Sequence, residues 1–96
     1  MTVNEIFTTR LELEGLLESM RDDLSCLEFE RVDTISAIDE LEATDAPDEI
    51  IDEAYSNLDE ITDEYATVEE HIEVVSETIA LLNKLESNFR FLRLEE

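Results

Sequence analysis

Residues 51–82 read IDEAYSNLDEITDEYATVEEHIEVVSETIALL, and their pattern determines the fold predicted for the whole chain. Apolar side chains recur in steps that alternate between three and four residues, at Ile51, Ala54, Leu58, Ile61, Tyr65, Val68, Ile72, Val75, Ile79 and Leu82. Because this average step is close to one helical turn, the ten side chains lie along one side of a helix, as in a coiled coil. The segment therefore predicts a long helix that packs on another helix along this stripe, its seam.

The residues before this segment predict a first long helix, over about residues 3–44. Thr2 and Glu5 have the spacing of a capping box at its start. Gly15, the only glycine, marks a kink, a close helix approach or a break. Arg31 lies near the apolar stripe and is expected to reach a carboxylate on the facing helix. That stripe changes register after Leu27, running through Ile6, Leu13, Leu17, Met20, Leu24 and Leu27 and then through Val32, Ile35, Ile38 and Leu41.

Residues 45–47 predict a tight connection between the two helices. Asp45 is suited to a helix cap, Pro47 to the first helical turn, and Asp48 and Glu49 to the positive end of a helix dipole. So short a connection makes the helices antiparallel, with residue n opposite roughly residue 92 − n. We therefore predict an all-α fold, a long antiparallel helical hairpin resembling a coiled coil. It forms a single domain over residues 1–96, with the second helix over about residues 48–90.

The ends of the chain leave two structural alternatives open. Residues 10–14 and residues 88–91 each alternate between polar and apolar side chains, so a short pair of terminal strands competes with the helical prediction. Residues 86–96 either continue the second helix or fold back on it.

Negative charge is the second dominant feature of the sequence. The chain has 28 Asp and Glu against six Lys and Arg, a net charge of −22. No Lys or Arg lies between Val32 and Asn83, whereas 17 Asp and Glu do. The sustained seam argues for a folded chain, although so high a charge is otherwise typical of disorder. Repulsion excludes direct binding to nucleic acid or to an anionic membrane, and favours basic proteins or divalent cations as partners.

Catalytic and metal-binding chemistry finds no support in the residues. His71 follows Val68 by three positions, so the Glu-x-x-His pattern of di-metal bundles is missing, and the acidic turn lacks the glycine of an EF-hand. Cys26 is the only cysteine, which we interpret as an inert thiol. We expect no enzyme, no cofactor and no metal site. With neither a signal peptide nor a membrane-spanning segment recognisable, we expect a cytoplasmic protein.

Outward-facing carboxylates form the first candidate partner-binding surface, the acidic face. Mixed charge would serve solubility equally well, so charge of one sign indicates an electrostatic use. Side chains one helical turn apart are about 5–6 Å from one another, and rows of carboxylates at this spacing could imitate a line of phosphates. The acidic face comprises Asp33, Asp39, Glu40, Glu42, Asp52, Glu53, Asp59, Glu60, Asp63, Glu70, Glu73 and Glu77.

In size and charge the chain resembles the acidic proteins with which phages and mobile elements inhibit restriction enzymes, nucleases and CRISPR effectors. The resemblance implies a nucleic-acid-mimicking inhibitor of a DNA- or RNA-binding protein, acting in the host cytoplasm. It includes no sequence motif, so it assigns no roles to individual residues.

Apolar residues off the seams support a different function. They predict that two hairpins dimerise into a four-helix bundle, or that the open end, where the termini lie, docks on a partner. The protein would then be a small coiled-coil assembly factor, chaperone or structural subunit. A third layer formed by the C-terminal residues is the structural alternative, and adaptation to high salt is another explanation of the acidity. The apolar patch comprises Phe7, Leu11, Phe29, Val74, Leu81, Leu85, Phe89, Phe91 and Leu94.

Overall fold

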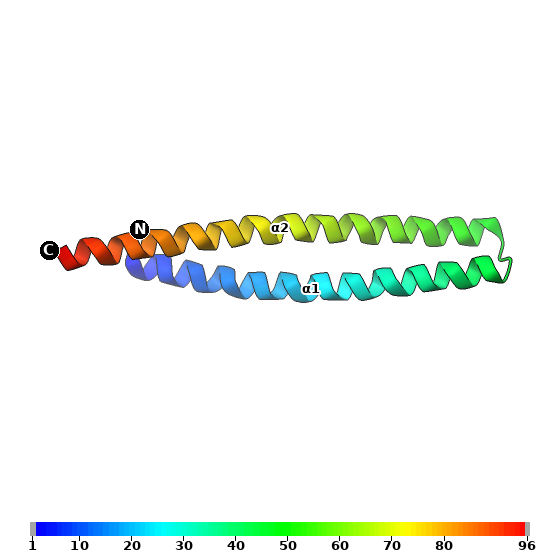
Figure 1. The fold of residues 1–96 in the computed structure, drawn as a ribbon, viewed down its shortest axis with the longest axis horizontal. Helices are drawn as coiled ribbons and strands as arrows, with labels where there is room; N and C mark the ends of the chain where they lie inside the picture. The colour runs from blue at the N-terminus through cyan, green and yellow to red at the C-terminus, as the bar shows by residue number, and fades with distance from the viewer. Residues whose placement is uncertain (1, 96) are drawn as a thin grey trace. The chain divides into compact units, whose positions relative to one another are not determined.

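The computed structural model describes the backbone of residues 2–95 and the side chains of residues 2–89. Two helices account for nearly all of it, α1 at Val3–Ala43 and α2 at Asp48–Glu95, joined by a short turn (Figure 1). The predicted all-α helical hairpin is confirmed. Both segments considered as terminal strands, residues 10–14 and 88–91, are helical, and α2 does not fold back before Glu95.

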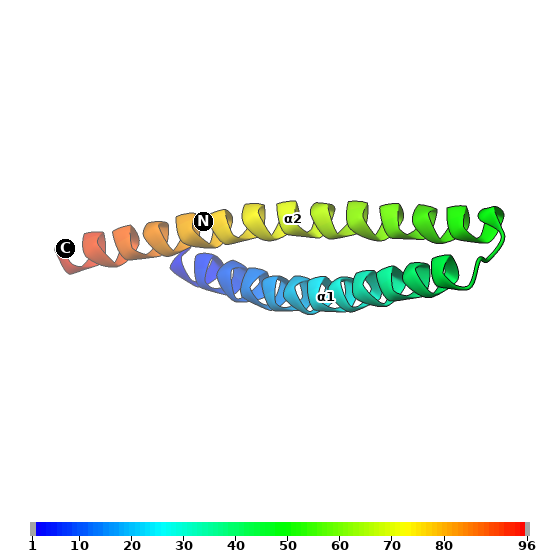
Figure 2. The ribbon, with the colours of Figure 1, turned by 45° about the vertical axis from the view of Figure 1, so that its right-hand side comes forward.

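The chain divides into two compact units, each built from parts of both helices. The tip unit is Asp22–Glu69 and contains the turn, whereas the open-end unit combines Met1–Arg21 with Glu70–Glu96. Within each unit, a segment of α1 lies beside a segment of α2 that runs in the opposite direction (Figures 1 and 2).

The seam predicted for α2 is confirmed by burial. All ten of its residues are buried or half-buried, and most of their neighbours are exposed. The same spacing continues beyond Leu82 to Glu86 and Phe89, which are buried and half-buried. A carboxylate therefore occupies a position that an apolar residue fills in the preceding turns.

The predicted change of register in α1 is wrong. The less exposed residues keep the alternating spacing from Val3 to Leu41 and pass through Arg10, Arg31 and Thr34, whereas Val32 and Ile35 are exposed. Polar residues can occupy these positions because most of their polar atoms have partners, although Arg31 Nε is buried without a hydrogen-bond partner among the described residues. The Thr34 hydroxyl, for example, donates to the Glu30 carbonyl at 2.7 Å. Helix geometry therefore keeps one straight seam, although the sequence places polar residues in it.

Contacts between the helices correct the predicted pairing of residues. Arg10 meets Glu86, and Arg31 meets Tyr65, so the residue numbers in each pair add up to 96. The expected sum was about 92 for helices folded symmetrically about residues 45–47. Helical side chains lean toward the N-terminus of their own helix. Each long side chain therefore reaches a point beside a lower-numbered position of its own helix. When two such side chains meet between antiparallel helices, the sum of their residue numbers is larger than the sum for two backbone positions that lie opposite each other.

The helix ends are formed by local hydrogen bonds. Thr2 Oγ1 accepts from the Glu5 N–H at 3.1 Å, which is one of the two hydrogen bonds of the predicted capping box. At the turn, Asp45 adopts a left-handed φ of 53°, and the Ala46 N–H donates to the Leu41 carbonyl at 3.0 Å. This is the Schellman arrangement that closes a helix, with Asp in the place usually taken by Gly. Asp45 thus ends α1 and does not cap α2.

Gly15 lies inside α1, which continues through it without a break. A Cβ atom added there would meet no heavy atom within 4 Å, so Gly15 serves no close helix approach in the described part of the chain. Within these described residues, neither helix is long and apolar enough to cross a membrane.

Replacing Gly15 by alanine is expected to raise the free energy of unfolding by about 0.5–1 kcal/mol, because alanine restricts the unfolded chain and adds no clash. Urea unfolding followed by circular dichroism measures this change. The inverse substitution Ala80→Gly, at an exposed position of α2, is the control and is expected to lower stability by a similar amount. A less stable Gly15→Ala variant would contradict the prediction.

Candidate partner-binding surfaces

All twelve residues of the acidic face are exposed. The structure gathers nine of them in the tip unit and leaves three, Glu70, Glu73 and Glu77, in the open-end unit. Carboxylates of the two helices also line a common groove in the tip unit. A polar groove of about 440 Å³ is lined by Glu30 and Asp33 of α1 and by Glu60 and Glu64 of α2. The groove offers several carboxylates at once to a cationic side chain.

The tip unit has a density of charge close to that of duplex DNA. It holds 18 Asp and Glu and one basic residue, Arg31. Its two helical segments have 22 residues each, about 33 Å at a rise of about 1.5 Å per residue. The carboxylates therefore occur about once per 2 Å, and duplex DNA carries one charge per about 1.7 Å.

Arg31 contributes little free positive charge to the surface. Its Nη2 lies 2.9 and 2.8 Å from the two carboxylate oxygens of Glu28, and its guanidinium carbon lies 5.2 Å from the centre of the Tyr65 ring. The carboxylate that Arg31 reaches is thus on its own helix, and its partner across the seam is an aromatic ring. The expected ion pair with the facing helix is not formed among the described residues.

Tyr55 and Glu42 join the two helices near the turn. The Tyr55 hydroxyl donates to Glu42 Oε1 at 2.5 Å. This hydrogen bond and the negative charge of Glu42 raise the pKa of Tyr55, with smaller contributions from desolvation and from Asp39. The protonated phenol is favoured because it both donates the hydrogen bond and avoids a third negative charge.

The Glu42→Gln substitution is expected to lower the pKa of Tyr55 toward its ordinary value of 10.0. A raised folded-state pKa contributes stability below the unfolded pKa, and this stability is lost as pH rises through the folded value. Ultraviolet absorbance of phenolate measures the titration in a Tyr65→Phe background, where Tyr55 is the remaining tyrosine. Asp39→Asn is the control, with a smaller decrease expected. Equal decreases for the two variants would contradict the assigned cause.

The apolar patch is divided between the two units. Phe7, Leu11, Val74, Leu81 and Leu85 are exposed in the open-end unit, where Phe89 is half-buried in the α2 seam. Phe29 lies in the tip unit and lines a separate groove. Phe91 and Leu94 lie outside the described side chains.

A second apolar stripe follows α2 in the open-end unit. Val74, Thr78, Leu81 and Leu85 are spaced by four, three and four residues, so they share one side of the helix beside the seam. Val74, Leu81 and Leu85 are exposed. This surface has the spacing that packs against a further helix.

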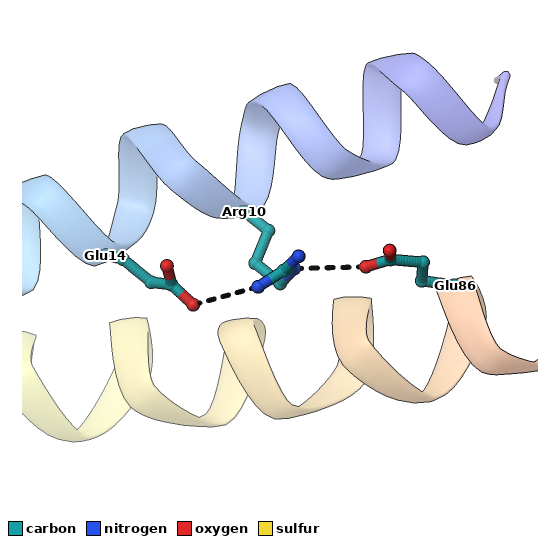
Figure 3. Close-up of polar contacts among 3 residues, drawn as sticks. All are labelled: Arg10, Glu14 and Glu86. Atoms are coloured by element: carbon teal, nitrogen blue, oxygen red, sulfur yellow. Dashed lines mark hydrogen bonds and ion pairs between the residues drawn. The ribbon is translucent and has the colours of Figure 1, made fainter.

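An ion pair in the seam of the open-end unit was missed by sequence reasoning (Figure 3). Arg10 Nε donates to Glu86 Oε2 at 3.1 Å, and its Nη1 lies 3.2 Å from Glu14 Oε1. The Glu86 side chain is 7% exposed and that of Arg10 is 18% exposed. The Arg10 guanidinium also stacks over the Phe7 ring at 5.2 Å. The available signal was the spacing, because both residues continue the seams of their helices.

Within the described residues, no group of three or more His, Cys, Asp or Glu side chains is placed to hold a metal ion. Cys26 and His71 are both exposed. No protein family, no curated protein and no solved structure matches this chain. The surfaces described above are therefore the basis for its proposed function.

Proposed function

We propose that this protein inhibits a DNA- or RNA-binding protein by occupying its nucleic-acid site with the tip unit. The charge density of that unit carries the proposal. The unit contains 18 carboxylates and one arginine, Arg31, which already contacts Glu28 and Tyr65. A positively charged cleft shaped for a phosphate backbone attracts such a surface and excludes proteins of mixed charge.

Rigid helices make the mimicry effective. Carboxylates on a continuous helix are held in place before binding, so the partner need not order a flexible acidic chain. Hydrogen bonding to bases has no equivalent here, so the phosphate-contacting residues of the partner are the expected target. An inhibitor of the phage or mobile-element anti-defence type would act in the host cytoplasm, where nucleases and CRISPR effectors meet nucleic acid.

Competition with nucleic acid tests the proposal directly. The tagged protein is used to capture partners from host lysate, and each captured partner is then challenged with duplex DNA and with RNA. A partner that nucleic acid displaces, and whose binding or cleavage of nucleic acid this protein blocks, supports mimicry. A partner that binds this protein and nucleic acid simultaneously, without loss of activity, would overturn it.

The exposed stripe of Val74, Leu81 and Leu85 favours a second candidate function, in assembly. Two copies could pack these stripes together into a homodimer with the character of a four-helix bundle, or the stripe could dock on another helical protein. The open-end unit suits self-association better than the tip unit, because five basic residues there offset ten acidic ones. Sedimentation equilibrium of the wild type and a Val74→Ser/Leu81→Ser variant tests dimerisation. A monomeric wild type would exclude the dimer.

A further inference from the structure

A groove of about 370 Å³ opens on the tip unit, on a side dominated by α1. It is lined by Leu24, Ser25, Glu28, Phe29, Val32 and Tyr65. Four of these residues are apolar or aromatic, and its volume is within the range of pockets that hold small ligands or single side chains. Tyr65 is the only lining residue contributed by α2, so the groove bridges the two helices of this unit.

The groove leaves a large apolar surface uncovered within an otherwise acidic unit. Phe29 is 74% exposed and Val32 is 50% exposed. A single exposed apolar side chain needs no explanation, but Phe29 and Val32 stand one helical turn apart beside a hollow. Covering the Phe29 ring would remove a substantial apolar area from water and would favour binding of a complementary side chain.

Carboxylates surround this apolar surface. Glu28 forms part of the wall, and exposed Asp22, Asp33 and Glu69 lie one helical turn from Ser25, Phe29 and Tyr65 respectively. Arg31 pairs with Glu28 and offsets the charge of that residue, so Asp22, Asp33 and Glu69 supply the excess negative charge. An occupant must therefore combine an apolar side chain with positive charge on either side of it. A second copy of the tip unit does not fit, because each unit would present 18 carboxylates to the other.

We propose that the groove receives one apolar side chain of a basic amphipathic segment of a partner protein, while neighbouring Lys and Arg of that segment meet the surrounding carboxylates. The inference rests on the proposed function, in that the acidic surface binds a basic protein. It adds a source of selectivity that charge alone lacks. Polyamines and simple basic tails carry the charge, but only a segment with a suitably placed apolar residue fills the groove.

Two synthetic peptides test this inference. Both are Lys-rich and amphipathic, and they differ at one central position, which is Trp in one and Ala in the other. The protein contains no Trp, so tryptophan fluorescence reports on the anchored peptide alone, and calorimetry compares the affinities of both. The Trp peptide is expected to bind about tenfold tighter or more than the Ala peptide. This ratio of affinities is the gain expected from burying a large apolar side chain.

Two matched variants locate the effect. Phe29→Ser is expected to reduce the preference for the Trp peptide to less than about threefold. Leu16→Ser changes an apolar side chain that is 48% exposed, in the open-end unit and outside both candidate binding surfaces, and is expected to preserve the preference. Circular dichroism checks that both variants keep their helicity.

The outcomes separate this inference from the proposed function. Equal binding of both peptides, or an unchanged preference in Phe29→Ser, would overturn the groove proposal and leave the electrostatic proposal standing. Failure of both peptides to bind at low salt would count against the acidic surface itself, and the groove proposal would fall with it.

Discussion

Replacing Glu86 by alanine is expected to lower the free energy of unfolding by about 2–4 kcal/mol. The substitution removes the acceptor of Arg10 Nε while the Arg10 side chain stays largely enclosed, at 18% exposure. The contact of Arg10 with Glu14 persists and offsets part of the loss. Urea unfolding at a fixed protein concentration measures the change.

The comparison with Glu14→Ala shows whether burial is the cause. Glu14 binds the same arginine at 3.2 Å, but its side chain is 42% exposed, so its loss is expected to cost about 0.3–0.5 kcal/mol. Similar values for the two variants would contradict the prediction. Replacing both members of the buried pair, in Arg10→Leu/Glu86→Leu, is expected to be neutral or stabilising by about 1–4 kcal/mol, because neither charge of the pair then remains to be desolvated.

The turn gives a reason to expect the Arg10–Glu86 pair to be replaceable by hydrophobic residues. A seam that repeats every seven residues can slip by one repeat, and a single polar position often prevents that slip in separate chains. Here the turn between Ala43 and Asp48 connects the helices with four residues, which already fixes their pairing. The ion pair therefore adds little to the choice of register, and hydrophobic replacements should keep the same fold.

The helices and the α2 seam were predictable because short local patterns in the sequence indicate them. Ten seam positions follow one unbroken spacing, and a proline next to acidic residues marks the turn. The α1 seam was predicted only in part. Arg10, Arg31 and Thr34 occupy seam positions, and a reading based on apolar residues alone moved the stripe to Val32 and Ile35. These three polar residues bind partners on neighbouring turns of α1 or on α2, and the local pattern of apolar residues does not reveal such partners.

For the candidate surfaces too, one feature was predictable from local sequence patterns and another depended on contacts between the helices. Exposure of the acidic residues followed from their positions outside the apolar stripes predicted for the two helices, and the structure places all twelve in solvent. The separation of Phe29 from the other apolar candidates did not follow, because it depends on which residues of α2 face it. Tyr65 completes the groove from 36 positions away in the sequence, a pairing that only the folded register defines.

The charge of the tip unit leads to the largest expected functional effect. Neutralising Asp52, Glu53, Asp59, Glu60 and Asp63 to Asn or Gln is expected to weaken binding to a captured nucleic-acid-binding partner by roughly 5- to 5000-fold. This range follows from five ion pairs worth about 0.2–1 kcal/mol each. Affinity measured by calorimetry at several salt concentrations gives both the loss and a shallower dependence on salt, because fewer charges take part.

A variant with the same net charge separates placement from total charge. Neutralising Glu5, Glu12, Glu14, Glu18 and Glu77 removes five solvent-accessible carboxylates from the open-end unit and none from the tip unit, and it keeps Glu70 and Glu73, which directly follow the tip unit in sequence. If the tip unit imitates nucleic acid, this variant should keep affinity within about threefold of the wild type, since exposed charges outside the contact surface act through solvent and are screened by 0.1 M salt. Equal losses in both variants would mean that overall charge alone attracts the partner. No loss in either variant would show that the carboxylates only solvate the helices, and the exposed stripe of Val74, Leu81 and Leu85 would then become the leading binding surface.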